Sequence, residues 1–300
     1  MINFVGRKNI FFIVSGAIIL LGMIAFAIFG GLNLDLDFQG GTAIRIEIGQ
    51  DFSDEDVRKL VSDTIGGHTV AVQKVGTNKT EAYIKTVEID TETRDKVVEA
   101  IKEKYSLDQN ALLEANNVSA SASTKLITDA FKATGWAVVF MLIYITFRFN
   151  IRSGLAAVLG LIHNILVMLS VYAIFRIPVN SSFIAAVLTI VGYSINDTIV
   201  VFDKIRENEK HDRRSEFGAV ANTSLNQTLT RTLNTSLTTL FTILTLYILG
   251  VASIREFALP IIIGVIVGTY SSICIATPLW VVLRGVKFGK KTKKVKKANA

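Results

Sequence analysis

The sequence predicts an α-helical membrane protein with six transmembrane helices and one small α+β domain between the first two. Half of its 300 residues are hydrophobic, and the mean hydropathy is +0.46. The apolar residues stand in long uncharged blocks, whereas a soluble protein spreads its core residues along the chain. Crossing about 30 Å of hydrocarbon takes about 20 helical residues, and five of the six blocks reach that length.

The expected spans are residues 9–30, 131–149, 154–175, 181–203, 228–250 and 257–283. The second block is the shortest, and it reaches Phe149 if Arg148 extends its charged end to the interface. The first block follows Arg7 and Lys8, as the apolar core of a secretory signal would. Signal cores have about 7 to 15 apolar residues, so the longer block here favours an uncleaved anchor.

Positive charge predicts that both chain ends are cytoplasmic. Lys and Arg collect in residues 1–8, around the connection between the second and third spans, in the loop 204–227 and in the tail 284–300. The two short loops on the other side hold only Arg176 and Arg255. The tail could contact anionic lipid or RNA, but a disordered stop signal explains it better. The pI near 9.4 therefore does not indicate nucleic-acid binding.

Residues 31–130 have a different composition, with 18 acidic and 11 basic residues, a net charge of −7 against +14 for the rest. "TAIRIEI" alternates as a half-buried strand, and a helix is expected after Ser53 as its N-cap. The strand-like runs "TVAVQKV" and "EAYIKTVEI" follow, then a helix over 91–104 and a weaker strand over 112–118. The order βαββαβ is the ferredoxin-like arrangement. With His68 alone and Cys274 as the only cysteine, no metal site or disulfide is expected within the chain.

Asp197 is the residue that most needs an explanation, because it interrupts the fourth span in "VGYSINDTIVVFDKIREN". A charge at mid-bilayer costs about 3 kcal/mol or more, so an intramembrane carboxylate is a functional candidate. In the fifth span Arg231 begins a stripe at helical spacing, continued by Thr235, Thr238, Thr242 and Thr245. The stripe indicates a lined pathway or polar interface, although threonines that bond back to their own helix would give the same pattern.

Counting depth at about 1.5 Å per residue puts both Asp197 and Arg231 in the inner half of the membrane, within reach of each other. Asn196 lies beside the carboxylate. Three glycines, Gly192, Gly264 and Gly268, are expected to pack helices closely. His163 and Asn164 form a polar pair that an interhelical hydrogen bond would explain as well as proton handling.

Four segments resemble a known family. "DFQGG" at 37–41 resembles the glycine-pair motif shared by the SecD and SecF subunits of the bacterial protein-export machinery. "GYSINDTIVVFDKIREN" at 192–208, "TLTRTLNTSLTTL" at 228–240 and "FALPIIIGVIVGTYSSI" at 257–273 resemble the SecF motifs of the fourth, fifth and sixth spans. The resemblance covers most of the chain in the expected order.

The resemblance implies half of an RND-type transporter in the bacterial inner membrane. SecD would complete a twelve-span unit, and the SecYEG channel, SecA and, more loosely, YajC would be further partners. A proton or sodium gradient would drive export of a preprotein. Asp197 and Arg231 fall on the family's intramembrane functional pair, and Asn196, Thr235 and Thr238 would assist it. Asp37, Gly40 and Gly41 would form the hinge to the external domain.

Two other functions fit the residues alone. One is an RND-like transporter of small molecules, although such exporters usually have much longer chains. The other is a passive assembly factor in which Asp197 and Arg231 form a structural ion pair. No phosphate-binding loop, nucleophile with its base or metal cluster is visible in the sequence. We therefore expect neither enzymatic activity nor a cofactor apart from the transported ion.

Overall fold

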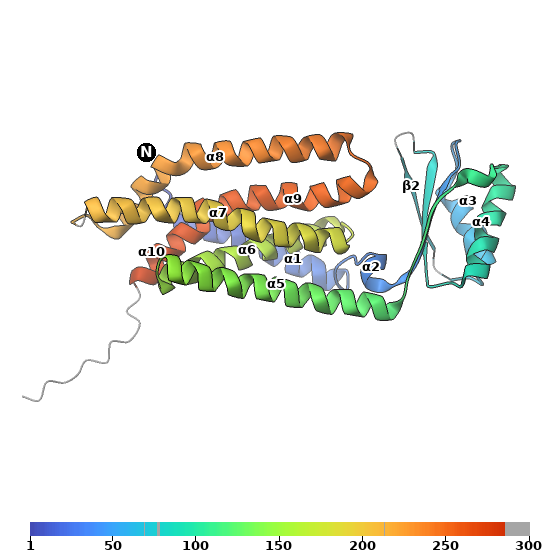
Figure 1. Cartoon of the computed structure of the whole chain (residues 1–300), viewed down its shortest axis with the longest axis horizontal. Helices are drawn as coiled ribbons and strands as arrows, with labels where there is room; N and C mark the ends of the chain where they lie inside the picture. Colours follow the sequence, from blue (N-terminus) through green and yellow to red (C-terminus); the bar gives the residue numbers. More distant parts are fainter. Residues whose placement is uncertain (69, 77–78, 213, 286–300) are drawn as a thin grey trace, which may run out of the picture.

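The structure is a computed structural model that describes residues 1–68, 70–76, 79–212 and 214–285. Long helices lie side by side in one bundle, and a small sheet with two helices stands at one end of it (Figure 1). Within the described residues, six helical segments are long and apolar enough to cross a membrane. They are Lys8–Ile28, Ala122–Arg148, Ile151–Phe175, Ser181–His211, Phe217–Leu249 and Ile254–Gly285. The prediction of six such helices is confirmed.

The helices of the bundle are α1 (Lys8–Ile28), α5 (Ala120–Arg148), α6 (Ile151–Phe175), α7 (Ser181–His211), α8 (Phe217–Leu249) and α9 (Ala252–Ser271). A π-helical segment, Ser272–Ala276, joins α9 to α10 (Thr277–Gly285). The interior is formed by α6, α7 and the last span, whereas α1, α5 and α8 leave most of their surface exposed. Exposed apolar helices are expected of a chain that meets lipid or a partner subunit on these sides.

The connection expected over residues 204–227 is much shorter in the structure, because α7 continues to His211 and α8 begins at Phe217. Arg206, Glu207 and Lys210 are exposed. Phe202, Ile205 and Leu225 of the same two helices are buried. The Asn208 side-chain amide donates to the Ser224 hydroxyl group at 2.8 Å and ties the two extensions together. The basic tail beyond residue 285 lies outside the described residues.

The soluble domain follows α2 (Leu36–Gln39) and contains, in chain order, β1 (Gly41–Glu47), α3 (Asp54–Thr64), β2 (Val70–Val75), β3 (Glu81–Thr86), α4 (Thr91–Tyr105), a short 3₁₀ turn (Gln109–Ala111) and β4 (Leu112–Val118). The sheet has the strand order β2-β3-β1-β4, and every neighbouring pair is antiparallel. Ile44 of β1 pairs with Ile84 of β3.

Helices α3 and α4 cover the sheet face that points away from the bundle (Figure 1). The core between them contains Ile44, Ile84, Val57 and Ile101, each with no exposed surface. The alternation of "TAIRIEI" therefore identified the buried face correctly. Ser53 does stand at the start of α3, but its side chain makes no capping bond.

Candidate functional site

Among the described residues, Asp197 is the one carboxylate that the membrane bundle buries, with 3% of its surface exposed. It lies on α7, next to Thr198 and three residues after Ser194, both of which are also buried. Its Oδ2 atom has no hydrogen-bond partner. A buried polar atom left without a partner costs about 1–3 kcal/mol. An unpaired carboxylate oxygen at this depth is thus a candidate for holding a proton or a small cation.

Arg231 and the threonine stripe lie on a different face of α8 from the one that meets Asp197. Arg231 and Thr238 are exposed, and Arg231 forms no ion pair within the described part of the chain. The hydroxyl groups of Thr235, Thr238 and Thr242 donate to backbone carbonyls of their own helix. Within the described residues, the hydroxyl groups of the stripe therefore donate to their own helix and to no other.

The buried polar face of α8 is formed by Thr228, Thr232 and Ser236 instead. Ser236 shares a hydrogen bond of 2.6 Å with Thr269 of α9, and the Thr232 hydroxyl oxygen is buried without a partner. These residues also recur at steps of four in the sequence, so the signal was present. The Arg231 stripe has nearly the same spacing, so spacing alone does not tell the buried face from the exposed one.

Hydrogen bonds between side chains link the helices around Asp197. The Asn164 amide of α6 donates to the Ser194 hydroxyl group of α7 at 2.7 Å. Thr198 of α7 and Ser272 of the π-helical segment are joined at 2.9 Å. π-Helical turns are rare and are frequent at functional sites. The bundle interior near Asp197 is therefore polar across four helical segments, which single-span patterns did not predict.

His163 is 9% exposed, and its Nδ1 atom lies 3.3 Å from Oδ1 of Asn164. Its Nε2 atom is buried without a partner. The structure thus places His163 at the edge of the same polar interior, through Asn164. Asn196, by contrast, is exposed although it precedes Asp197, because adjacent helical residues point about 100° apart.

Two of the three predicted packing glycines lie at close helix contacts. A Cβ atom added to Gly264 would lie 2.4 Å from Ile190 of α7, and one added to Gly268 would lie 3.2 Å from Ser194. Gly192 differs, because it is exposed and a Cβ atom there would meet nothing within 4 Å. Its predicted packing role therefore has no partner within the described residues. Gly22 of α1, which was not predicted, is also a close approach, because a Cβ atom added there would lie 2.3 Å from Ser170 of α6.

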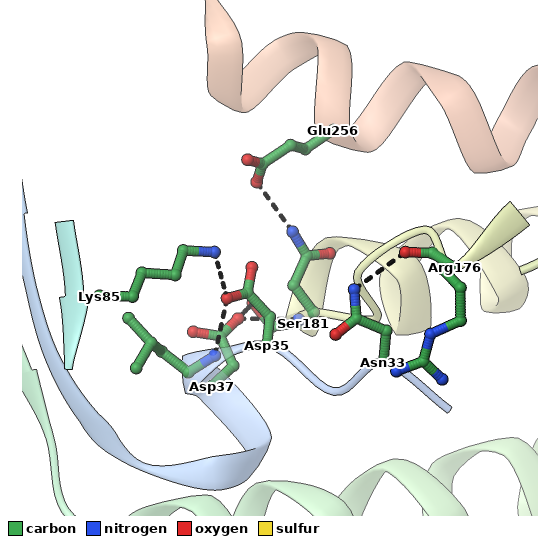
Figure 2. Close-up of polar contacts among 9 residues, drawn as sticks. Asn33, Asp35, Asp37, Lys85, Arg176, Ser181 and Glu256 are labelled. Carbon is green, nitrogen blue, oxygen red and sulfur yellow. Dashed lines mark hydrogen bonds and ion pairs between the residues drawn. The ribbon is translucent and has the colours of Figure 1, made fainter. Parts of the chain in front are cut away.

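Asp37 connects the segment after α1 to the start of α7 (Figure 2). Its Oδ2 atom accepts hydrogen bonds from the Ser181 backbone N–H, at 2.8 Å, and from the Ser181 hydroxyl group. Helix N-termini have unpaired N–H groups and favour negative charge. Asp37 thus adds a cap from outside the helix to the one that carries Asp197, beside the local cap from Asn180.

The glycine pair after Asp37 is required by local geometry. Gly40 and Gly41 have φ of 75° and 135°, values that residues with a Cβ atom rarely adopt. A Cβ atom on Gly41 would also lie 2.3 Å from the Thr86 carbonyl oxygen. The chain therefore turns sharply from α2 into β1 at this point, where the soluble domain begins.

The same junction holds an ion pair between Lys85 of β3 and Asp35, at 2.5 Å, with only 22% and 12% of the two side chains exposed. Tyr83 lies beneath the Lys85 ammonium group, 4.9 Å from the ring centre. Burial, followed by the charges of Asp35 and Glu256, raises the pKa of the Tyr83 phenol to about 12. Negative charge is therefore concentrated where the soluble domain meets the bundle.

Comparisons with known proteins agree on one family. The family model for protein export membrane proteins SecD/SecF, C-terminal part, matches residues 97–286. The chain is 35% identical to protein translocase subunit SecF of Petrotoga mobilis over 302 residues, covering 98% of this chain and 99% of the relative. It is 34% identical to protein translocase subunit SecDF of Bacillus subtilis, covering 94% of this chain and 38% of the relative.

Among solved structures, the crystal structure of SecDF from Thermus thermophilus, a translocon-associated membrane protein, is similar with a TM-score of 0.82 at 34% identity. The similarity covers 95% of this chain and 39% of that one. The chain thus spans nearly the full length of the SecF relative and about two fifths of the SecDF proteins.

Proposed function

Because the chain belongs to the SecD/SecF family of protein export membrane proteins, we propose that it is one half of an ion-driven machine that promotes protein translocation. The family membership supports a part in translocation. The gradient, the sidedness and the partners are our proposals. The role is non-enzymatic, and the ion that passes through is cargo rather than a cofactor.

The main observation behind ion coupling is the buried Asp197 carboxyl group with one oxygen unpartnered. Burial favours the neutral form of a carboxyl group, and a nearby guanidinium group favours its charged form. A small shift of α7 against α8, which are in contact, changes the distances from this carboxyl group to Arg231 and to Ser236. Asp197 therefore binds a proton or a sodium ion in one arrangement and releases it in the other.

Asp37 links this shift of α7 to the soluble domain. Movement of α7 displaces Ser181, which is bonded to Asp37, and the chain turns into β1 three residues later at Gly40 and Gly41. Interfaces of this kind convert small helix shifts into domain rotation. The antiparallel β2-β3-β1-β4 sheet with two helices on one face supports a ferredoxin-like fold for this lever.

SecD is the proposed partner, and it supplies the other six spans. The Bacillus subtilis and Thermus thermophilus relatives, which are more than twice as long as this chain, support this pairing. The exposed face of α8 with Arg231 and Thr238 suits a polar interface with that partner. SecYEG, SecA and YajC are looser associates, in a bacterial inner membrane with both ends of the chain cytoplasmic.

Purification of this chain from a native membrane should recover SecD in near-equal amount. Recovery of the chain as a lone, stable homo-oligomer would contradict the pairing.

The test of ion coupling compares preprotein translocation into inverted vesicles with and without an imposed proton or sodium gradient. Asp197→Asn preserves the shape of the side chain and removes its titration, so gradient-driven stimulation should vanish while ATP-driven translocation continues. Asp203→Asn is the matched control, because Asp203 lies on the same helix but is 43% exposed and paired with Arg148. Equal stimulation in wild type and Asp197→Asn would leave Asp197 a purely structural residue.

The passive alternative fits less well. An assembly factor held by a structural ion pair needs Asp197 and Arg231 to meet, and no such pair forms within the described residues, where Arg231 is exposed. An RND-like exporter of small molecules remains distinguishable by transport assays on the isolated pair of subunits.

A further inference from the structure

The soluble domain is attached to the bundle by more than its two chain connections. Lys85 lies in β3, near the middle of the domain's sequence, and its ammonium group contacts Asp35, 50 residues earlier in the segment that leaves α1 (Figure 2). The two side chains are 22% and 12% exposed, whereas the Lys96–Glu92 pair of the same domain is 64% and 77% exposed. Exposed pairs contribute little to stability, so the Lys85 pair is the better candidate for a specific contact.

Asp35 is fixed to the start of α7 rather than to the soluble domain. Its backbone N–H donates to the Val179 carbonyl at 2.9 Å, and the Val179 N–H donates to the Asn33 carbonyl at 2.8 Å. Residue 180, directly after Val179, is the N-cap of α7. By holding Asp35, Lys85 therefore attaches the sheet to the N-terminal end of the helix that carries Asp197.

A second carboxylate lies within electrostatic range of Lys85. Figure 2 shows Glu256, near the start of α9, on the same side of the junction as Lys85 and Asp35, and Glu256 accepts a hydrogen bond from the Asn180 amide at 2.8 Å. An ammonium group is a compact charge with three donors on a flexible stem, so it can exchange acceptors. An open groove of about 550 Å³, lined in part by Gly40, Gln73 and Lys85, lies beside this contact.

We infer that Lys85 is a positioning residue that latches the soluble domain to the start of α7 through Asp35, and that it transfers to Glu256 when the domain moves. The inference rests on the proposed function and extends it by naming the contact that transmits the movement. Asp35 keeps its place after the transfer, because its Oδ1 atom also caps α2 through the Leu36 N–H at 2.7 Å.

The first test measures amide hydrogen exchange of residues 36–41 in the full chain with its partner subunit. Lys85→Met and Asp35→Asn each remove the ion pair, and the asparagine retains the cap of α2. Each should speed exchange at these amides about tenfold or more, and the double variant should be no faster than either single one. Lys96→Met is the matched control and should change nothing at 36–41. Exchange equal to that of Lys96→Met would overturn the latch.

The second test measures gradient-driven translocation by the same variants. Lys85→Met should lose most of the stimulation, Lys85→Arg should retain it, and Glu256→Gln should reduce it without changing exchange at 36–41. If the β1 amides of Lys85→Met also exchange quickly, that variant has unfolded the domain. The proposal is then tested by the stimulation measured for Lys85→Arg and Glu256→Gln. Full stimulation in Glu256→Gln would refute the transfer. Absence of stimulation in wild type would refute the proposed function instead, while hydrogen exchange would still test the latch.

Discussion

Replacing Gly264 by alanine tests whether the contact between α7 and α9 depends on the absence of a side chain. The new Cβ atom would lie 2.4 Å from Cγ1 and 3.0 Å from Cγ2 of Ile190, where ordinary contact begins near 3.4 Å. Ile190 is 2% exposed, and a β-branched side chain in a helix has one strongly preferred rotamer. The helices must therefore separate by roughly 1 Å, an overpacking that costs about 1–3 kcal/mol.

Cys274 provides the assay, because it is the only cysteine of the chain and is 6% exposed in the bundle core. A thiol-reactive dye reports unfolding when heat exposes this side chain. At about 2–4 °C per kcal/mol for a protein of this size, Gly264→Ala should lower the Tm by about 2–12 °C.

Two further variants make this result decisive. Gly192→Ala adds the same methyl group to open space on α7 and should leave the Tm unchanged or slightly higher. Ile190→Ala removes the atoms that clash, so Gly264→Ala should cost less in that background than in wild type. A Tm of Gly264→Ala equal to that of Gly192→Ala would refute the reasoning.

Three further predictions concern the soluble domain and the buried face of α8. Ile84→Ala truncates a residue with no exposed surface and should destabilise the domain by about 2–5 kcal/mol, read as faster hydrogen exchange across β1 and β3; unchanged exchange would contradict the assigned core. In the folded protein the pKa of the Tyr83 phenol is raised from 10.0 to about 12. The stability that the neutral phenol contributes is therefore complete below pH 10 and is lost as the pH rises towards 12. Chemical denaturation should show this alkaline loss of stability in wild type and less of it in Tyr83→Phe. Thr232→Val should change the ion concentration that half-saturates gradient-driven translocation, because the Thr232 hydroxyl oxygen is buried without a partner. Thr235→Val should leave this concentration unchanged, because the Thr235 hydroxyl group bonds to its own helix. Equal half-saturating concentrations in the two variants would exclude Thr232 from the ion site.

Much of the architecture followed from local patterns. Uncharged blocks predict membrane helices because a bilayer has a fixed thickness and each backbone group must be paired inside it. The alternation around Ile44 and the helical spacing of Val57 and Val61 likewise identified buried faces that the structure confirms. Each of these signals lies within one element, so neighbouring residues are enough to read it.

Asp197 was found in the same way, since a lone carboxylate in an apolar run is unusual whatever surrounds it. The residues that face Asp197 could not be predicted from the sequence, because the rotation of a helix about its own axis depends on the helices around it. A turn of about 100° separates Thr235, which is half-buried beside the exposed Arg231 and Thr238, from the buried Ser236. Contact of α8 with α7 and α9 decides between these faces, and both have threonines at helical spacing.

The sequence by itself determined the six apolar helices, the composition of the soluble domain and the presence of a carboxylate among the spans, because hydropathy and charge act residue by residue. Only the tertiary structure decided that Asp37 caps α7 and that Lys85 reaches Asp35. Those contacts join residues 144 and 50 positions apart. Their existence depends on how the bundle and the sheet are placed in space, which no local pattern specifies.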